Sequence, residues 1–582
     1  MKTATLALKP YLEKIEQLCE PLDKAALSKL IVELARQVAP EERRDFLDSV
    51  LSLLPVEPQQ AAAVSVSSET GLLKEIAGLR QEIIDRISAI EDGSYWDDPD
   101  DDWQDSYYDD EGPDLLSDDQ QAALTSFFTD AGQLFMAGRK EEARQVYDAL
   151  LSLLNEAELS SSSLLPDFNV DLREARARYA RCVYESAAEG ERVQAMLTAM
   201  AAEQEGSDMD GLLAGEYPLL QDVMDAETGT LAGFDQFLPA WEKALGRMGF
   251  QEDRVAGLRL EAAFLQGGVT AVADLARSWQ AKQPRGYLYW LQKLEDGEDW
   301  PGLKQAGHEA LKALPLGRDR GRAALCLARA GKKLGDQGAV LDGCRERFRS
   351  QPGEGSLLDL VAEAERQQVR GKELAEVCSF LSGHKSGHDE KVLLVKALLM
   401  AGRLAEAFAL CERNKPVGWS YGNATGLLFA SLLHLSCAGQ ANCTLVRELL
   451  HDYAGCRSYY PDSFDGSERD PDVSGLEEIM RGLGLVDPAT VDADRYRQWA
   501  GNIGEKRINH IVSNKQRSAY DRAAQVLAAL AEDMTAAGKK SEAKALLQDY
   551  CKVRYNRHVA FRKEVREAVG KSVILRGMAA GL

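Results

Sequence analysis

The sequence predicts an all-α protein, an α-solenoid of divergent helical hairpins preceded by a small N-terminal helical unit. From Gln120 onward, apolar residues recur at helical spacing in one segment after another. Short Gly, Pro or Asp stretches separate these segments, and the alternating pattern of a β-strand is nearly absent. A short motif that combines a helix-ending glycine with a following Glu-Ala pair also recurs at three junctions. We therefore expect pairs of helices joined by tight turns.

The chain has 582 residues, of which 69 are basic and 93 acidic, so its formal net charge is −24. This length predicts several domains or one long repeat array. The negative charge repels phosphate backbones and anionic lipid and favours basic partners, so nucleic acid is a poor first expectation. No apolar run is long enough to span a membrane, and the first residues become charged too early for a signal peptide. We expect a cytoplasmic protein without membrane association.

Changes in composition divide the chain into five predicted parts. They are an N-terminal helical unit (1–56), a linker with an amphipathic helix (57–92), an acidic linker containing aromatic residues (93–119), a helical repeat body (120–415) and a C-terminal helical region with a basic last helix (416–582). In the second part, six apolar residues form one stripe at helical spacing: Leu72, Ile76, Leu79, Ile83, Ile87 and Ile90. This helix is expected either to dock on its own chain or to pair with a second copy.

Residues 91–119 form the most biased segment, with fourteen acidic residues, five aromatic residues and no lysine or arginine. Such a segment buries too little apolar surface to offset its ordering entropy, so we expect it to be disordered in isolation. It is either a solvated linker or a recognition segment for a protein with a basic surface. In the second case the binding residues are the aromatic ones, Tyr95, Trp96, Trp103, Tyr107 and Tyr108.

The three junction motifs are Ala137–Ala143, Ala401–Ala407 and Ala537–Ala543. In each, the glycine suits a left-handed helix end, the glutamate suits the start of the next helix, and the last alanine allows close helix contact. These junctions resemble the turns of tetratricopeptide repeats. A fourth turn is expected at Ala330–Lys332, without the Glu-Ala pair. The three clean motifs are irregularly spaced against a 34-residue period, which predicts divergent repeats.

A second resemblance concerns the last helices of the chain and residues 231–245. They are similar to the helical region that accompanies SWIM-type zinc fingers in bacterial proteins. The finger itself needs a Cys-x-Cys pair followed by Cys-x-His, and this chain has neither. The DNA-binding role of that family is therefore not carried over to this chain, and the resemblance implies only contact with other proteins.

Most of the ten cysteines lie in apolar helical patterns and are expected to be buried, reduced thiols. Zinc is the alternative for one cluster, because cysteine and histidine are its usual ligands. The opposite ends of a helical hairpin would have to meet to form that site, so we expect no metal and no cofactor. The cluster comprises His434, Cys437, Cys443, His451 and Cys456.

Three short motifs resemble catalytic or ligand-binding sites, but the residues around them do not fit such sites. Gly418–Gly422 matches a nucleophile elbow with Ser420, but no strand precedes it, so a serine hydrolase is the weakest alternative. Gly570-Lys571-Ser572 lacks the earlier glycine of a phosphate-binding loop. The acidic loop at 459–472 has Phe464 where calcium needs an oxygen ligand. We expect His384 and His388 to be exposed residues flanking a turn.

The last helix is the better candidate for binding. Residues 552–576 contain eight basic and two acidic residues. This patch is expected to receive the acidic segment of the same chain, to bind an acidic partner or to touch nucleic acid; the alternative is a solvated capping helix. The candidate residues are Arg554, Arg557, Arg562, Lys563 and Arg566.

Taken together, these patterns predict a non-enzymatic scaffold or adaptor that binds other proteins through helical repeat surfaces and an acidic recognition segment. One alternative is a regulatory substrate or sequestering protein in a bacterial signalling or defence complex, controlled by proteolysis in a linker or in the loop at 457–475. Limited proteolysis with a single functional cut would favour this alternative.

Overall fold

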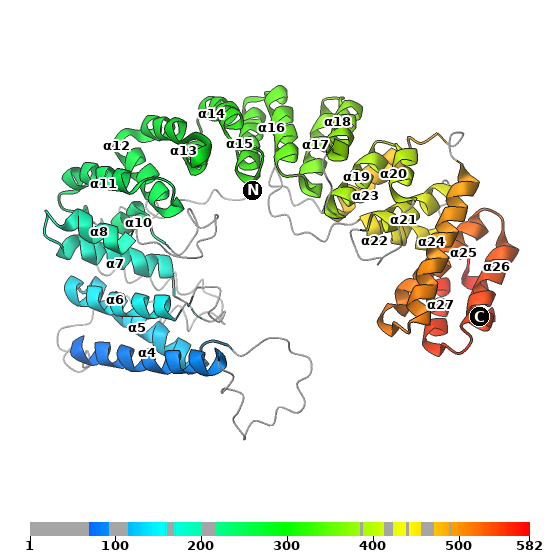
Figure 1. Ribbon diagram of the computed structural model, residues 1–582, viewed down its shortest axis with the longest axis horizontal. Helices are drawn as coiled ribbons and strands as arrows, with labels where there is room; N and C mark the ends of the chain where they lie inside the picture. The colour runs from blue at the N-terminus through cyan, green and yellow to red at the C-terminus, as the bar shows by residue number, and fades with distance from the viewer. Residues whose placement is uncertain are drawn as a thin grey trace, which may run out of the picture. The chain divides into compact units, whose positions relative to one another are not determined.

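The computed structural model describes residues 69–91, 114–157, 159, 168, 170–200, 217–227, 229–383, 388–412, 423–437, 442–454, 471–487 and 492–582. Every regular element in these ranges is helical, and none of them contains a strand (Figure 1). This result confirms the predicted all-α fold. The contacts divide the chain into two compact units, residues 1–271 and 272–582, which are described separately. The predicted N-terminal unit, residues 1–56, lies outside the described residues.

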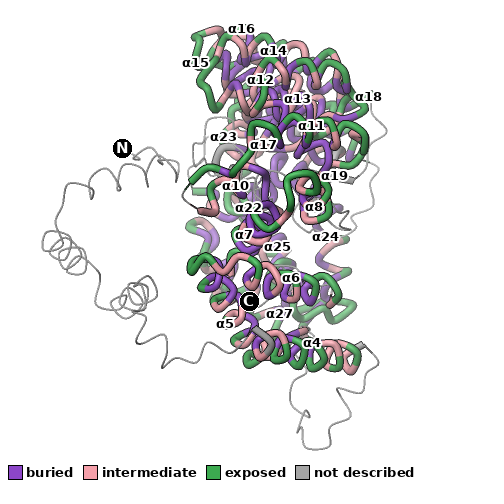
Figure 2. The backbone as a smooth tube through the Cα atoms, turned by 90° about the vertical axis from the view of Figure 1, so that its left-hand side faces the viewer, coloured by how far each residue is buried: buried purple, intermediate pink, exposed green. Residues whose placement is uncertain are grey.

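The described residues of the first unit form eight helices, and the last of them continues past residue 271. They are α4 (Glu69–Glu91), α5 (Asp118–Met136), α6 (Lys140–Glu156), α7 (Leu172–Ser186), α8 (Arg192–Met200), α10 (Leu220–Asp225), α11 (Phe234–Met248) and α12 (Asp253–Trp279). In α4, four residues of the predicted stripe are buried: Leu72, Ile76, Leu79 and Ile83. Figure 2 shows that the same helix also has exposed positions, as expected for an amphipathic helix. Because α4 packs against α5 and α6, it docks on its own chain.

The acidic segment ends in ordered structure. Ser117 caps α5, since its hydroxyl accepts a hydrogen bond from Gln120 N while the Gln120 side chain accepts one from Ser117 N. Leu116 is buried in the core of the first unit. Residues 114–117 therefore lead directly into α5, which begins at Asp118, although the sequence placed residues up to 119 in the linker. The negative charges of Asp118 and Asp119 fall in the first turn of the helix, where they stabilise it.

A buried carboxylate of α12 binds the first residues of α10 in the first unit. Glu261 of α12 accepts hydrogen bonds from the backbone N–H groups of Leu220 and Gln221 at 2.7 and 2.8 Å. Burial raises the pKa of Glu261 to about 7, against the lowering effect of these two bonds. Nearby, Arg254 donates to the carbonyl oxygens of Met200 and Pro218 at 2.8 and 2.6 Å, and burial lowers its pKa to about 10.

The second unit consists of successive helical hairpins followed by a C-terminal bundle (Figure 1). The hairpins are α13 (Arg285–Asp296) with α14 (Trp300–Ala313), α15 (Arg318–Leu334) with α16 (Gln337–Ser350), α17 (Glu354–Arg366) with α18 (Arg370–Gly383), and α19 (His388–Met400) with α20 (Leu404–Cys411). The remaining helices are α21 (Ala424–Ser436), α22 (Thr444–Ala454), α23 (Pro471–Leu483), α24 (Ala493–Ser513), α25 (Tyr520–Ala536), α26 (Lys540–Gln548) and α27 (Val559–Lys571). One continuous core runs from Ala328 to Met578, and the boundary predicted at 415/416 falls inside it.

The three motif junctions are helix–turn–helix turns, as predicted. Gly138, Gly402 and Gly538 all have left-handed backbone angles, with φ of 75°, 70° and 80°. In each turn the residue after the glycine donates its N–H to a carbonyl five residues earlier, for example Arg403 to Leu398 at 2.8 Å. The closing alanines, Ala143, Ala407 and Ala543, have no exposed surface. The glycine and alanine positions therefore do what the sequence pattern predicts.

The turn predicted at Ala330–Lys332 is wrong. Those residues lie inside α15, which continues to Leu334 and turns at Gly335, where φ is 70°. Gly331 serves packing instead, because a Cβ atom there would lie 2.8 Å from the backbone nitrogen of Val340 in α16. The Ala-Gly-Lys pattern was misleading because a glycine at a close helix contact resembles a glycine at a helix end.

The same turn also occurs where no glycine marks it. Glu298, Gln368 and Lys515 have φ of 53°, 59° and 55°, and each precedes a residue that makes the same backbone hydrogen bond. In the hairpin series, the positive-φ residues at 298, 335, 368 and 402 lie 37, 33 and 34 residues apart. The repeat in this part of the chain is therefore more regular than its glycines indicate.

Candidate binding surfaces

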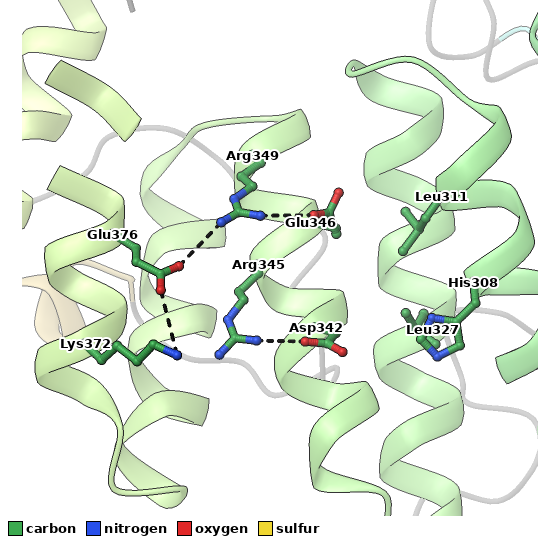
Figure 3. Close-up of a pocket in the computed structure, with 9 residues that line it drawn as sticks. All are labelled: His308, Leu311, Leu327, Asp342, Arg345, Glu346, Arg349, Lys372 and Glu376. Atoms are coloured by element: carbon green, nitrogen blue, oxygen red, sulfur yellow. Dashed lines mark hydrogen bonds and ion pairs between the residues drawn. The ribbon is translucent and has the colours of Figure 1, made fainter. Parts of the chain in front are cut away.

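A groove of about 320 Å³ crosses three of these hairpins (Figure 3). Its lining residues come from α14, α15, α16 and α18, and most of them are charged. They are His308, Leu311, Leu327, Asp342, Arg345, Glu346, Arg349, Lys372 and Glu376. Three second helices of consecutive hairpins, α14, α16 and α18, thus contribute to one surface.

An ion pair between the half-buried Arg345 of α16 and the buried Glu373 of α18 supports the groove. The guanidinium of Arg345 donates two hydrogen bonds to Glu373, at 2.7 and 2.6 Å, and a third to Asp342 at 2.8 Å. Glu373 is almost completely buried, whereas Asp342 is exposed. These bonds, led by that to Glu373, raise the pKa of Arg345 above its ordinary value. Arg345 is therefore a fixed cation, held by the fold.

Glu346 is held by Arg320 of α15, with hydrogen bonds of 3.1 and 2.5 Å, whereas Arg349, Lys372 and Glu376 are held more loosely. Arg349 lies 3.3 Å from Glu346 and 3.4 Å from Glu376, and the Lys372 ammonium lies 3.9 Å from Glu376 (Figure 3). Arg349 and Lys372 keep 41% and 67% of their side-chain surface exposed. Exposed ion pairs at these distances contribute little to stability, so a partner can exchange them for pairs of its own. Arg349, Lys372 and Glu376 are thus suited to reversible binding.

No motif in the sequence marked this groove, although one residue could have indicated it. Glu373 lies five residues after the positive-φ residue Gln368, and the equivalent positions of the three motif turns hold Ala143, Ala407 and Ala543. A glutamate at a position that otherwise holds a buried alanine needs a cation from a neighbouring helix. Recognising it requires knowing that Gln368 is a turn residue.

The structure divides the predicted basic last helix. Residues 549–554 form a π-helical segment, α27 covers Val559–Lys571, and residues 576–581 form a 3₁₀-helix. The single helix predicted over 552–576 is therefore wrong. Tyr555 lies between the π-helical segment and α27. It is buried, and its hydroxyl donates a hydrogen bond of 2.8 Å to Asn509, which holds this non-helical part of the chain in place.

The five basic residues predicted for binding have different surroundings. Arg554 forms ion pairs with Glu505 and Asp549 and lies over the Tyr550 ring, so it is engaged within the fold. Arg566 donates to the carbonyl of Leu582 at 3.1 Å. The exposed Lys563 lies 3.6 Å from Glu567, Arg562 is half-buried, and Arg557 is exposed. These three remain candidates for binding.

The predicted aromatic binding residues, Tyr95, Trp96, Trp103, Tyr107 and Tyr108, lie outside the described residues. The same holds for Ser420 and its two glycines, the loop at 459–470, His384 and the His388 side chain. Ser572 of the Gly-Lys-Ser sequence is fully buried at the end of α27 and donates a hydrogen bond to Glu532. It therefore serves the core of the second unit.

The cysteine–histidine cluster is only partly brought together. Cys437 and Cys443 are buried and within hydrogen-bonding contact, and burial raises the pKa of both thiols. Burial also lowers the pKa of His434, while His451 is exposed beside Asp452 and Cys456 lies outside the described residues. Within the described ranges, no group of three or more His, Cys, Asp or Glu side chains is arranged to hold a metal ion. In the same ranges, no helix has the length and apolar character needed to cross a membrane.

Comparison with protein families and with curated proteins gives no match from which a function can be transferred. No family model matches the chain, and no curated protein is detectably similar to it in sequence. The repeated hairpins and the surfaces that they form are therefore the features from which a function can be inferred.

Proposed function

We propose that this protein is a non-enzymatic scaffold or adaptor that binds other proteins through the surfaces of its helical repeats. The observation that carries the proposal is the groove formed by the second helices of three consecutive hairpins, α14, α16 and α18. A repeat array of this kind offers extended surface with few strict requirements on any one residue.

The hairpins support a relationship to tetratricopeptide repeats. Their turns lie 33 to 37 residues apart, close to the 34-residue period of that family. In three turns of the chain, glycine is followed by arginine or lysine and then by a buried alanine, as in the family's turn. This relationship fits a role in protein binding, because helix-pair repeats present recognition surfaces made from several successive units.

The groove's charges point to a partner that carries both signs. Arg349 and Lys372 can pair with carboxylates, while Glu376 can accept from lysine or arginine. Arg345 already pairs with Glu373 and Asp342, so it holds α16 against α18 and is not counted among the exchangeable charges. An extended segment or a helix with alternating charges would replace the weak pairs of the free groove with better-aligned ones.

Affinity purification from the source cells, followed by quantitative mass spectrometry, tests this proposal. The bait is the full chain, compared with a variant carrying Arg349→Glu and Lys372→Glu. A matched control carries Arg247→Glu and Lys243→Glu, which are exposed residues of α11 outside the groove. We expect at least one partner to be lost from the groove variant and retained by the control. Identical partners for all three baits would contradict a role for the groove.

A further inference from the structure

The last eighty residues form a basic surface in an acidic protein. Residues 501–582 carry sixteen basic and eight acidic side chains, whereas the whole chain has a net charge of −24. Two of the eight acidic residues, Glu532 and Asp533, are buried, so they contribute nothing to the surface directly. The exposed surface of this region is thus more basic than its sequence indicates.

Several of these cations have no partner within the fold. In the part of the chain that the structure describes, Lys552, Arg557 and Lys571 are exposed and make no ion pair. Lys552 lies in the π-helical segment 549–554, Arg557 lies in the turn before α27, and Lys571 is the last residue of α27. Unpaired cations on the surface attract an acidic ligand over a distance of about one Debye length, which is roughly 10 Å at moderate salt.

Exposed aliphatic side chains accompany the cations. Val553, Val559 and Val573 have 70%, 66% and 55% of their surface exposed. Each is within two residues of one of the three unpaired cations. Apolar contacts of this kind favour a ligand that has bulky apolar or aromatic groups beside its negative charges.

The aromatic residues of this region argue against single-stranded nucleic acid as the ligand. Tyr550, Tyr555 and Phe561 are buried, and the rings of Tyr555 and Phe561 pack edge to face with their centroids 5.8 Å apart. They are therefore not available as a platform for stacking bases. The exposed valines suit an acidic peptide better.

We propose that this basic surface binds an acidic, aromatic-containing peptide segment, and that residues 92–113 of this chain are its occupant. These 22 residues include ten acidic and five aromatic residues and no lysine or arginine. The acidic groups pair with Lys552, Arg557 and Lys571, and the aromatic rings pack on the neighbouring valines and on arginine. This inference concerns a different surface from the groove and does not depend on it.

A labelled peptide of residues 92–113, followed by fluorescence anisotropy, tests the proposal. The receptor is the full chain in which the ten acidic residues of 92–113 are changed to Asn or Gln, so that its own segment no longer competes. We expect the peptide to bind this receptor, to bind the unaltered chain more weakly, and to bind less tightly as salt rises. No binding to either protein would overturn the proposal.

Charge reversal then locates the site. Adding Lys552→Glu, Arg557→Glu and Lys571→Glu to the receptor is expected to weaken binding by about tenfold or more. The matched control reverses Lys243, Arg247 and Lys282, which are exposed residues elsewhere with no ion pair in the described structure. Circular dichroism should show the same helix content in both variants. An equal loss with the control variant would show that only net charge matters and would overturn the assignment.

Three further ligands test whether the surface is specific for this peptide or binds any polyanion. A peptide with all five aromatic residues changed to Ala keeps its charge and should bind several-fold more weakly. Vesicles containing phosphatidylserine and a 20-base-pair DNA duplex are tested under the same conditions. If these bind as tightly as the peptide, or if the aromatic changes have no effect, the surface is a general anion binder and the proposal fails.

Discussion

The hydroxyl group of Ser572 donates a hydrogen bond of 2.6 Å to Glu532 Oε1, and neither residue has any exposed surface. The other carboxylate oxygen of Glu532 accepts from Val446 N at 2.9 Å in the first turn of α22. One buried glutamate of α25 thus joins the start of α22 to the chain that leaves α27. Burial raises the pKa of Glu532 in spite of these bonds.

Ser572→Ala should therefore destabilise the second unit by roughly 1–3 kcal/mol, because a buried acceptor loses its donor. Urea unfolding followed by circular dichroism measures this loss. Ser379→Ala, at an exposed position of α18, is the control and should change stability by less than about 0.5 kcal/mol. Equal effects from the two changes would show that the Ser572 hydrogen bond does not stabilise the fold.

The ion pair of Arg345 and Glu373 predicts an unusual ranking of variants. Arg345→Ala leaves a buried carboxylate without its main partner and should cost about 3–5 kcal/mol. Glu373→Ala introduces the residue that the three motif turns have at this position and should cost much less. The double variant should be more stable than Arg345→Ala alone. Thermal unfolding of the three variants tests the ranking, and additive losses would contradict it.

The turn residues predict changes of opposite sign. Gly402→Ala puts a side chain at φ 70° and should lower stability by about 1–2 kcal/mol. Gln368→Gly relieves the same strain at φ 59° and should raise stability by up to about 1 kcal/mol, less the added entropy of the unfolded chain. Both are measured by urea unfolding. A destabilising Gln368→Gly would show that the glutamine side chain contributes more than its backbone strain costs.

The buried Glu261 makes the first unit sensitive to pH. Its pKa is about 7 in the folded protein against an ordinary value of 4.5, so the folded state binds this proton more tightly than the unfolded state. The contribution to stability is complete below pH 4.5 and is lost as the pH rises through about 7, a loss of about 3 kcal/mol.

Amide hydrogen exchange of peptides from α10 and α12, measured at pH 5 and pH 8 and corrected for the intrinsic rate, tests this dependence. Protection should fall at pH 8 in the natural protein. Glu261→Gln keeps an acceptor but removes the charge, so its protection should differ little between the two pH values. The same pH response in the variant would assign the effect to another group.

The helices and the glycine turns could be predicted from the sequence because their signals are local. Helical periodicity placed the α4 stripe, and the position of Gly402 placed a turn. The turns at Glu298 and Gln368 were missed because a residue with a side chain gives no local sign of a positive φ. They hold this conformation because the packed helices on either side require it.

The candidate groove could not be predicted for a related reason. Arg345 and Glu373 are 28 residues apart, and only the stacking of α16 on α18 brings them together. The role of Ser572 likewise depends on Glu532, 40 residues away. By contrast, the charge contrast between residues 91–119 and the C-terminal region was visible in the sequence, although the structure removes Arg554 from its binding set by pairing it with Glu505 and Asp549.

The most direct measurement of the scaffold proposal is site-specific photo-crosslinking from the groove in living cells. A photoreactive phenylalanine analogue is placed at position 308 or 372, and at the exposed Lys544 of α26 as a control position. The proposal predicts a discrete protein adduct from both groove positions, absent from position 544 and reduced by Arg349→Glu. Adducts of equal intensity at all three positions, or none at the groove, would contradict it.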